Sequence, residues 1–109
     1  MKYKSKRSRA TDIDQETKRK VFERDGGLCI FCYQPGAPNA HYIPRSQGGL
    51  GIEENIVTAC AECHRKMDQS YLRPVFLERA REHLRANYTD WNEDKLRYRK
   101  GDHHGKDHV

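Results

Sequence analysis

Two pairs of cysteines most constrain what this chain of 109 residues can fold into. Cys29 and Cys32 form one CxxC pair, Cys60 and Cys63 form another, and 27 residues lie between the pairs. Two residues between thiolates let both sulfur atoms point at one ion, and two such pairs complete the tetrahedral shell that Zn²⁺ prefers. The spacing therefore predicts a structural zinc site with four cysteine ligands, in which the protein fills every coordination position.

Disulfide bonds and redox-active CxxC motifs are the alternatives for these cysteines. The N-terminal sequence MKYKSKRSRA is followed by no apolar stretch of the signal-peptide type, and no apolar run approaches the roughly 18–20 residues that span a bilayer. We therefore expect a cytoplasmic protein with no membrane partner, where cysteines are more often metal ligands than disulfides. No thioredoxin-like βαβ pattern surrounds either pair, which disfavours the redox interpretation.

The composition makes a metal useful to the fold. Charged residues are 34% of the chain and hydrophobic residues 35%. A chain of this length buries only about 60–68% of its unfolded surface, so its core is expected to be thin. The interval between the pairs also exceeds the roughly 15–20 residues of a simple zinc ribbon, which indicates a substantial structure between them.

Positive charge is concentrated toward the N-terminus. The formal net charge is +5, and residues 2–24 contain nine basic and four acidic residues, so this segment accounts for the whole excess. A basic surface indicates a polyanionic partner such as nucleic acid. We expect residues 1–11 to be a disordered arm, either a solubilising tail or a segment that contacts phosphates.

A helix is predicted after this arm, from a cap at Asp12 or Asp14 to about residue 24. Val21 and Phe22 are predicted to face inward, and Asp25 with the two glycines after it to end the helix. Four basic residues of this helix are candidate DNA contacts, namely Lys18, Arg19, Lys20 and Arg24.

Proline, glycine and apolar spacing predict the remaining elements. Residues 28–43 are expected to form a knuckle and a hairpin, and residues 44–51, with three glycines, an ordered loop. Helices are predicted over residues 63–71 and 74–87, the second with an apolar stripe toward the core. A short helix is predicted over residues 89–96, with Trp91 and Leu96 folding back on the domain.

These elements divide the chain into the arm, a domain of residues 12–88 and a C-terminal extension of residues 89–109. Residues 101–109 are expected to be a disordered tail. The three histidines in this tail leave open the alternative of a metal-binding segment.

Several motifs occur in a specific order in and around the interval between the cysteine pairs. They are RDGGLC at residues 24–29, HYIPRSQGG at residues 41–49 and NIVTACAECH at residues 55–64. With this set the sequence resembles the HNH endonucleases, which have the ββα-metal (His-Me finger) fold, and in particular their small zinc-containing members in phages and prophages. The resemblance extends over about residues 14–68. It implies an α+β protein with a small ββα-metal core, held by the four-cysteine zinc site and flanked by helices.

The resemblance also implies roles for individual residues. His41, at the end of the first strand, would be the general base for attack of water on a phosphodiester, and its ordinary pKa of about 6.5 predicts weaker cleavage below that pH. Asn55 would hold the strand of the base through hydrogen bonds, or be an ordinary cap or turn residue. His64 would bind one divalent cation: Mg²⁺, Mn²⁺, Ni²⁺ or Zn²⁺. Arg45 would bind the scissile or an adjacent phosphate, or form a surface ion pair.

One position departs from the common pattern of the family. The residue before the catalytic histidine is often Asp, Glu or His and binds the metal, whereas here it is Ala40. This leaves the metal with one ligand fewer. Asp68 follows His64 by four residues and so shares its helix face, where it could supply a carboxylate oxygen to the ion or be a solvated acid.

Three functions are compatible with these residues. The first is a metal-dependent endonuclease that nicks or cleaves double-stranded DNA with weak sequence specificity, leaving 5′-phosphate and 3′-hydroxyl ends as its relatives do. The second is a zinc-containing DNA-binding module that has lost catalysis, for which Ala40 is the direct argument. The third is a zinc-stapled protein-interaction domain, which would leave the positive charge without a role. The resemblance further suggests a monomer or homodimer encoded by a phage or prophage, with a packaging partner such as a terminase.

Overall fold

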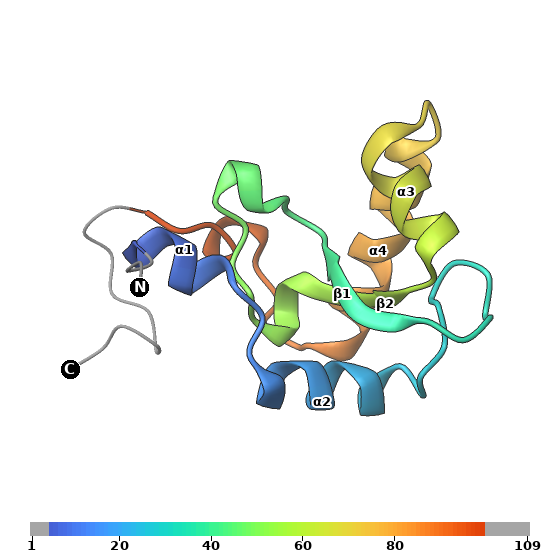
Figure 1. Cartoon of the computed structure of the whole chain (residues 1–109), viewed down its shortest axis with the longest axis horizontal. Coiled ribbons are helices and arrows are strands. Elements are labelled where there is room, and N and C mark those ends of the chain that lie inside the picture. The colour runs from blue at the N-terminus through green and yellow to red at the C-terminus, as the bar shows by residue number, and fades with distance from the viewer. Residues whose placement is uncertain (1–4, 100–109) are drawn as a thin grey trace, which may run out of the picture.

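Two antiparallel strands lie at the centre of the fold, and helices surround them (Figure 1). The computed structural model describes residues 5–99. The longer elements are, in chain order, α1 (Lys6–Thr11), α2 (Gln15–Arg24), β1 (Ala37–His41), β2 (Ile56–Ala59), α3 (Ala61–Gln69) and α4 (Arg73–Asn87). Short 3-10 turns cover Arg45–Gln47, Glu53–Asn55 and Glu93–Lys95. The expected α+β class, with the order strand, strand, helix of a ββα core, is confirmed.

The pairing of the two strands is irregular at one point. Strand β1 has one residue more than β2 between the partner pairs Ala37–Ala59 and Ala40–Val57. The extra residue makes a β-bulge at residues 38–39, a feature that redirects side chains and is frequent beside active sites. All four positions of β2 are buried. The sheet therefore has little freedom to shift, and the bulge has a fixed place two to three residues before His41.

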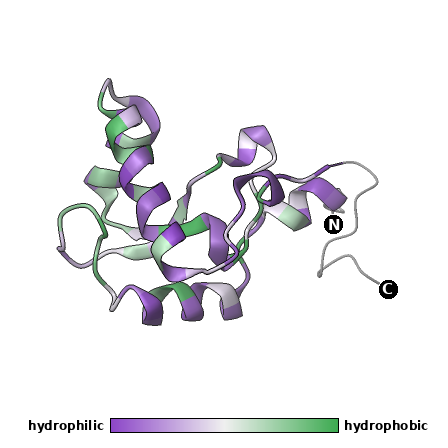
Figure 2. Cartoon of the chain, turned by 180° about the vertical axis from the view of Figure 1, so that it is seen from behind, coloured by the Kyte–Doolittle hydropathy of each residue, from purple (hydrophilic) through white to green (hydrophobic). Residues whose placement is uncertain are grey.

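Helix α2 begins and ends near the predicted residues. The side chain of Asp14 accepts a hydrogen bond of 2.8 Å from the backbone N–H of Thr17, so Asp14 is the cap. Gly26 and Gly27 follow the helix with φ of 65° and 72°, a conformation that glycine adopts readily. In Figure 2 this helix is mostly hydrophilic, with one short hydrophobic stretch.

One prediction for that hydrophobic stretch is wrong. Val21 is fully buried as expected, but Phe22 is 47% exposed. Successive residues of an α-helix point about 100° apart, so both side chains do not face the same narrow core. The ring of Phe22 lies instead over Gly27, where an added Cβ would meet it at 2.7 Å.

Helices α3 and α4 confirm the two helices predicted after the second cysteine pair. Helix α3 covers residues 61–69 rather than 63–71, because Cys60 caps its first turn. Helix α4 has Pro74 in its first turn, as expected. Within its predicted apolar stripe, Ala80 and Leu84 are completely buried, whereas Val75 is 65% exposed. Together with residues of the sheet, the buried side chains of the two helices form a single core.

The expected disorder of residues 1–11 is wrong for residues 6–11, which form α1. The side chain of Ser5 caps the helix by accepting a hydrogen bond from the N–H of Ser8. Ala10 and Thr11 are buried against the rest of the domain. This helix has six residues and no apolar periodicity, so tertiary contacts stabilise it rather than a signal in its own sequence. Residues 1–4 and the predicted disordered tail at 101–109 lie outside the described residues.

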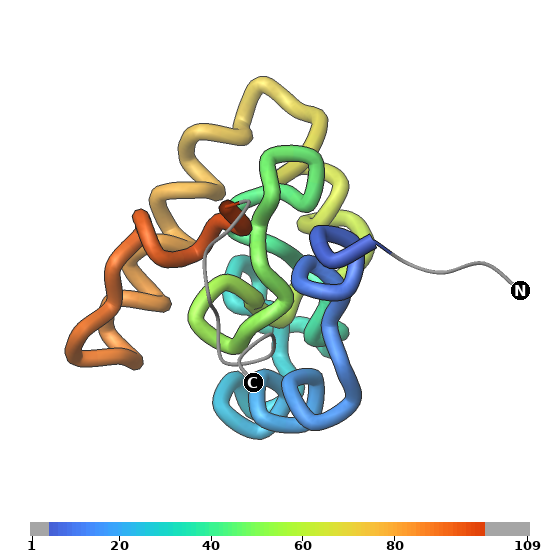
Figure 3. Tube along the Cα trace, turned by 90° about the vertical axis from the view of Figure 1, so that its left-hand side faces the viewer, coloured from blue at the N-terminus to red at the C-terminus, as the bar shows by residue number. Residues whose placement is uncertain are grey.

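The segment after α4 returns to the core, as predicted (Figure 3). Leu96 is 2% exposed, and its carbonyl oxygen accepts a hydrogen bond from the N–H of Leu50. The indole N–H of Trp91 donates to the carbonyl oxygen of Glu54 at 2.7 Å. The predicted short helix is a single 3-10 turn. Up to residue 99 this extension therefore packs with the domain.

The loop at residues 44–51 is ordered, as its glycines predicted. An added Cβ at Gly49 would lie 1.7 Å from the carbonyl oxygen of Ile43, and one at Gly51 would lie 2.0 Å from that of Asp12. Backbone segments approach each other so closely there that only glycine fits. Within residues 5–99, no helix is long and apolar enough to cross a membrane.

Candidate functional site

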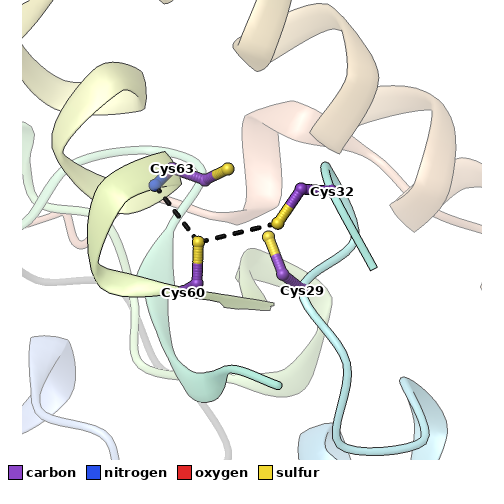
Figure 4. Close-up of side chains that lie close together, drawn as sticks. All are labelled: Cys29, Cys32, Cys60 and Cys63. Carbon is purple, nitrogen blue, oxygen red and sulfur yellow. Dashed lines mark hydrogen bonds between the residues drawn. The ribbon is translucent and has the colours of Figure 1, made fainter. Parts of the chain in front are cut away.

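The four cysteines converge at one end of the sheet (Figure 4). Their sulfur atoms all lie within 4.8 Å of one another, and none forms a disulfide. The Cys32 and Cys60 sulfur atoms are 3.7 Å apart. Four sulfur atoms at ~2.3 Å from a tetrahedral Zn²⁺ are separated by about 3.8 Å, so this spacing suits the ion. The donor set could therefore hold a structural metal such as zinc, as the sequence predicted.

The pKa values of these thiols reflect four sulfur atoms held in one place. Burial raises the pKa of Cys29, but backbone N–H groups of Cys60 and Cys32 outweigh this and lower it to about 7. Burial and the neighbouring sulfur atoms raise the pKa of Cys63. A bound Zn²⁺ takes up thiolates, so metal binding would release a proton from Cys63, and the charge of the ion would compensate the repulsion among the thiolates that result.

A cleft of about 700 Å³ opens beside the sheet, and four of the predicted site residues line it. These are His41 from the end of β1, Arg45 from the loop that follows, and His64 and Asp68 from α3. The sheet and helix α3 thus bring the candidate base and the candidate metal ligands to one surface. Asn55 does not line the cleft and lies within the core beneath it.

The ring of His41 is held in one orientation by the backbone of the N-terminal segment. Its Nε2 atom lies 2.9 Å from the carbonyl oxygen of Thr11. A carbonyl oxygen only accepts hydrogen bonds, so Nε2 carries the proton and Nδ1 of the neutral ring is an acceptor. Burial lowers the pKa of His41; the hydrogen bond to Thr11 opposes this, and the charge of Arg45 adds to it. The neutral, basic form therefore prevails at neutral pH.

Asn55 joins the loop after β1 to the start of β2. Its side chain is fully buried. Its Oδ1 accepts a hydrogen bond of 2.8 Å from the N–H of Ile43, and its Nδ2 donates to the carbonyl oxygens of Ile43 and Leu50. These three bonds fix the chain two residues after His41, and they are the bonds that a positioning asparagine requires.

His64 and Asp68 are neighbours on one face of α3. The His64 Nε2 atom is 3.4 Å from the Asp68 Oδ2 atom. An imidazole nitrogen and a carboxylate oxygen can share one divalent cation. Among the described residues, only the cysteine cluster brings three or more His, Cys, Asp or Glu side chains within reach of one ion, so His64 and Asp68 form a pair without a third such ligand close by. Ala40 is completely buried and adds none.

Basic residues contribute unequally to the cleft. Lys18 and Arg45 both line it, and Arg45 forms an ion pair with Asp12 across the loop. Arg19 pairs with two glutamates of its own helix, and Lys20 lies 3.6 Å from Glu53. The positive charge of α2 that remains for a polyanion is therefore centred on Lys18.

Arg24 corrects the sequence-based assignment of a DNA contact. Its side chain is 10% exposed and pairs with Asp25, which is fully buried. It also donates to the carbonyl oxygens of Glu53 and Ile56 and to the hydroxyl of Tyr88. Arg24 is an internal structural residue, because every nitrogen of its guanidinium already has a partner.

The cleft contains residues that the sequence did not indicate, chiefly Asn39, Gln69 and Arg73. Asn39 belongs to the bulge of β1 and lies two residues before His41, where residues of a strand share a face. That alternation was the one available signal. The role of Thr11 depends on a backbone carbonyl and on the packing of α1, so no side-chain pattern indicated it.

The fold and the cleft together define a ββα domain with one histidine on its first strand and one on its helix. Residues 29–69 match the family model described as HNH endonuclease. The matched segment runs from the first cysteine to the end of α3, so it contains both strands, the cysteine cluster and the predicted site residues. The resemblance seen in the sequence is confirmed, and this segment is an HNH endonuclease domain, of a family that generally cleaves DNA. No curated protein matches the chain.

Proposed function

We propose that the protein is a metal-dependent endonuclease that nicks or cleaves double-stranded DNA. The observation that carries this proposal is the cleft, in which His41 is oriented with Nδ1 as an acceptor and lines the same space as the His64–Asp68 pair. A base and a cation beside one phosphodiester are the two requirements for hydrolysis by water.

In this reaction Nδ1 of His41 takes a proton from water as the water oxygen attacks phosphorus. The bond from phosphorus to the leaving 3′ oxygen breaks, and this oxygen takes up a proton from solvent water, which gives the 5′-phosphate and 3′-hydroxyl ends typical of the relatives. His64 and Asp68 would hold a divalent cation, Mg²⁺, Mn²⁺, Ni²⁺ or Zn²⁺, which stabilises negative charge on the phosphate oxygens. Lys18 and Arg45 bind phosphates of the substrate, and Arg45 exchanges Asp12 for a phosphate when DNA enters.

Three parts of the structure position the site without touching the substrate. The carbonyl oxygen of Thr11 selects the tautomer of the base. Asn55 holds the chain that follows β1, and the four cysteines, with a zinc ion bound, would hold the end of β2 and the start of α3. The cleft is thus fixed from both ends, as precise placement of a base and a cation requires.

The decisive experiment is a nicking assay on supercoiled plasmid with protein that metal analysis shows to contain one zinc per chain. Nicking is expected with at least one of Mg²⁺, Mn²⁺ and Ni²⁺ and is expected to stop with EDTA. Binding without nicking in every metal would contradict the nuclease proposal. It would support the second candidate, a DNA-binding module without catalysis, which the buried Ala40 in place of a metal ligand favours.

The biological setting is also a proposal. The resemblance to small phage and prophage nucleases suggests a role in genome packaging beside a partner such as a terminase, in mobility of the encoding element, or in attack on competing DNA. Mapping the cleavage sites on the DNA of the source genome separates these. Clustered sites would support packaging or mobility, and scattered nicks would contradict both.

A further inference from the structure

A second hollow, of about 550 Å³, adjoins the cleft on the side of the cysteine cluster. Four residues line both spaces, namely Asn39, His64, Asp68 and Gln69. The two spaces are therefore one groove that crosses α3 at His64 and Asp68. The small residues Gly36, Ala37 and Ala61 line the second hollow, so backbone lies close to its surface.

Arg65 supplies the permanent positive charge that lines this second hollow. Arg65 is exposed, and within residues 5–99 its side chain has no hydrogen bond or ion pair. Glu62, three residues before it on α3, pairs instead with Lys66 at 3.2 Å. The single acid of the hollow is Asp68, which faces His64. An unpaired guanidinium beside a groove of this kind is suited to an anion.

The cations of the groove lie on both sides of the candidate metal ligands. Lys18, Arg45 and Arg73 line the first space, and Arg65 lines the second. A DNA strand carries a phosphate at every nucleotide, so a strand whose scissile phosphate lies at His64 must place further phosphates on either side. A groove with cations at one end only would hold the strand on one side of the cleaved bond.

We propose that Arg65 binds the DNA phosphate backbone on the opposite side of the scissile phosphate from Arg45, so that the cleaved strand follows the groove over α3. This assignment rests on the proposed nuclease function. Arg65 contributes affinity and alignment of the strand and takes no part in bond breaking. The sequence-based set of DNA contacts, which ended at Arg45, is thereby extended to the second half of the HNH segment.

The test measures binding of a 20-base-pair duplex by fluorescence anisotropy in EDTA at several salt concentrations. Removal of one phosphate contact lowers the slope of log K against log salt by about 0.9. Arg65→Ala is therefore expected to lower the slope by this amount and the affinity by about fivefold at low salt. Arg85→Ala is the control, because Arg85 is an exposed arginine of α4 that lines neither space. Equal slopes for the two variants would overturn the proposal.

Single methylphosphonate substitutions, which remove the charge of one phosphate, locate the contact. On a duplex with one mapped cleavage site, Arg65→Ala is expected to abolish the effect of a substitution on one side of the site, and Arg45→Ala the effect on the other. If both variants abolish the effect of substitutions on the same side of the cleavage site, the assignment is overturned. If the wild type nicks DNA and Arg65→Ala behaves as Arg85→Ala does, this inference alone fails. If the wild type neither binds nor nicks DNA, the proposed function fails first.

Discussion

The Nε2 atom of His41 lies 2.9 Å from the backbone carbonyl oxygen of Thr11, which ties the proposed base to the segment between α1 and α2. This contact and the burial of the ring act on the pKa of His41 in opposite directions, and burial prevails. The pKa is therefore lower than the ordinary value of about 6.5. The base stays neutral at pH values at which a free histidine is already protonated.

The pH dependence of nicking follows from this direction. A general base works in its unprotonated form, so a lowered pKa extends activity to more acidic solutions. We expect the acid limb of the rate to have its midpoint below about pH 6.5, rather than at that value as the sequence alone predicted. Rates of nicking at saturating DNA, measured across mildly acidic and neutral pH with zinc content checked at each pH, test this. A midpoint above the ordinary histidine value would contradict the orientation and burial of His41.

The buried Asn55 is expected to carry a large share of stability. Asn55→Ala removes three hydrogen bonds and leaves two buried carbonyl oxygens and one N–H without these partners, a loss of about 2–4 kcal/mol. The control is Asn87→Ala, because Asn87 is exposed and makes one hydrogen bond within α4. Urea unfolding of the zinc-loaded variants measures both. Equal stabilities would mean that Asn55 does not hold the loop.

A second buried polar group predicts a pH-dependent stability. Burial raises the pKa of Asp25, but hydrogen bonds from His83 and Arg24 outweigh it, so the pKa lies well below its usual range. The ionised carboxylate thus stabilises the fold at every pH above the unfolded pKa of about 3.9, and this contribution disappears as the pH falls further. Asp25→Asn is expected to lose about 1–3 kcal/mol at neutral pH.

Urea unfolding of the wild type, Asp25→Asn and the control Asp90→Asn from neutral to acidic pH tests this sign. Loss of zinc in acid affects all three proteins, so the difference between them isolates the carboxylate. The gap between the wild type and Asp25→Asn should narrow below about pH 4, and Asp90→Asn, at an exposed position, should follow the wild type. A gap that widens in acid would reverse the assignment.

Asp68 is expected to be a ligand of the divalent cation in the cleft. Because its carboxylate lies beside His64 on the same helix face, Asp68→Ala should weaken Mn²⁺ binding about tenfold or more. Calorimetric titration of zinc-loaded protein with Mn²⁺ measures the affinity, and Asp90→Ala is the matched control. Identical affinities for the two variants would show that Asp68 does not bind the cation.

Much of this architecture could be predicted from local signals. Asp14 and the glycines after α2 mark its ends, Pro74 marks the start of α4, and the cysteine spacing predicted a cluster that the structure brings within 4.8 Å. Each of these signals acts over a few residues, so it is visible without knowledge of the fold.

The remainder depends on contacts between distant segments. Helix α1 is stabilised partly by Arg7, which donates to the carbonyl oxygens of Arg45 and Ser46, 38 and 39 residues away. Arginine is a common phosphate contact, so the sequence alone suggested that role for Arg24. Its hydrogen bonds to the backbone of a 3-10 turn and of β2 show that it stabilises the fold instead. The second half of the groove could not be predicted either, because only the fold brings Asn39 of the β1 bulge and Arg65 of α3 to the lining of one hollow.

His41 is proposed to be the base of a DNA-cleaving site. The most direct test compares plasmid nicking by the wild type and by His41→Ala, with equal zinc content and equal affinity for Mn²⁺ established first. We expect the wild type to nick DNA and His41→Ala to be slower by about 10²-fold or more, as for loss of a positioned base. Equal nicking by the two proteins would contradict this assignment.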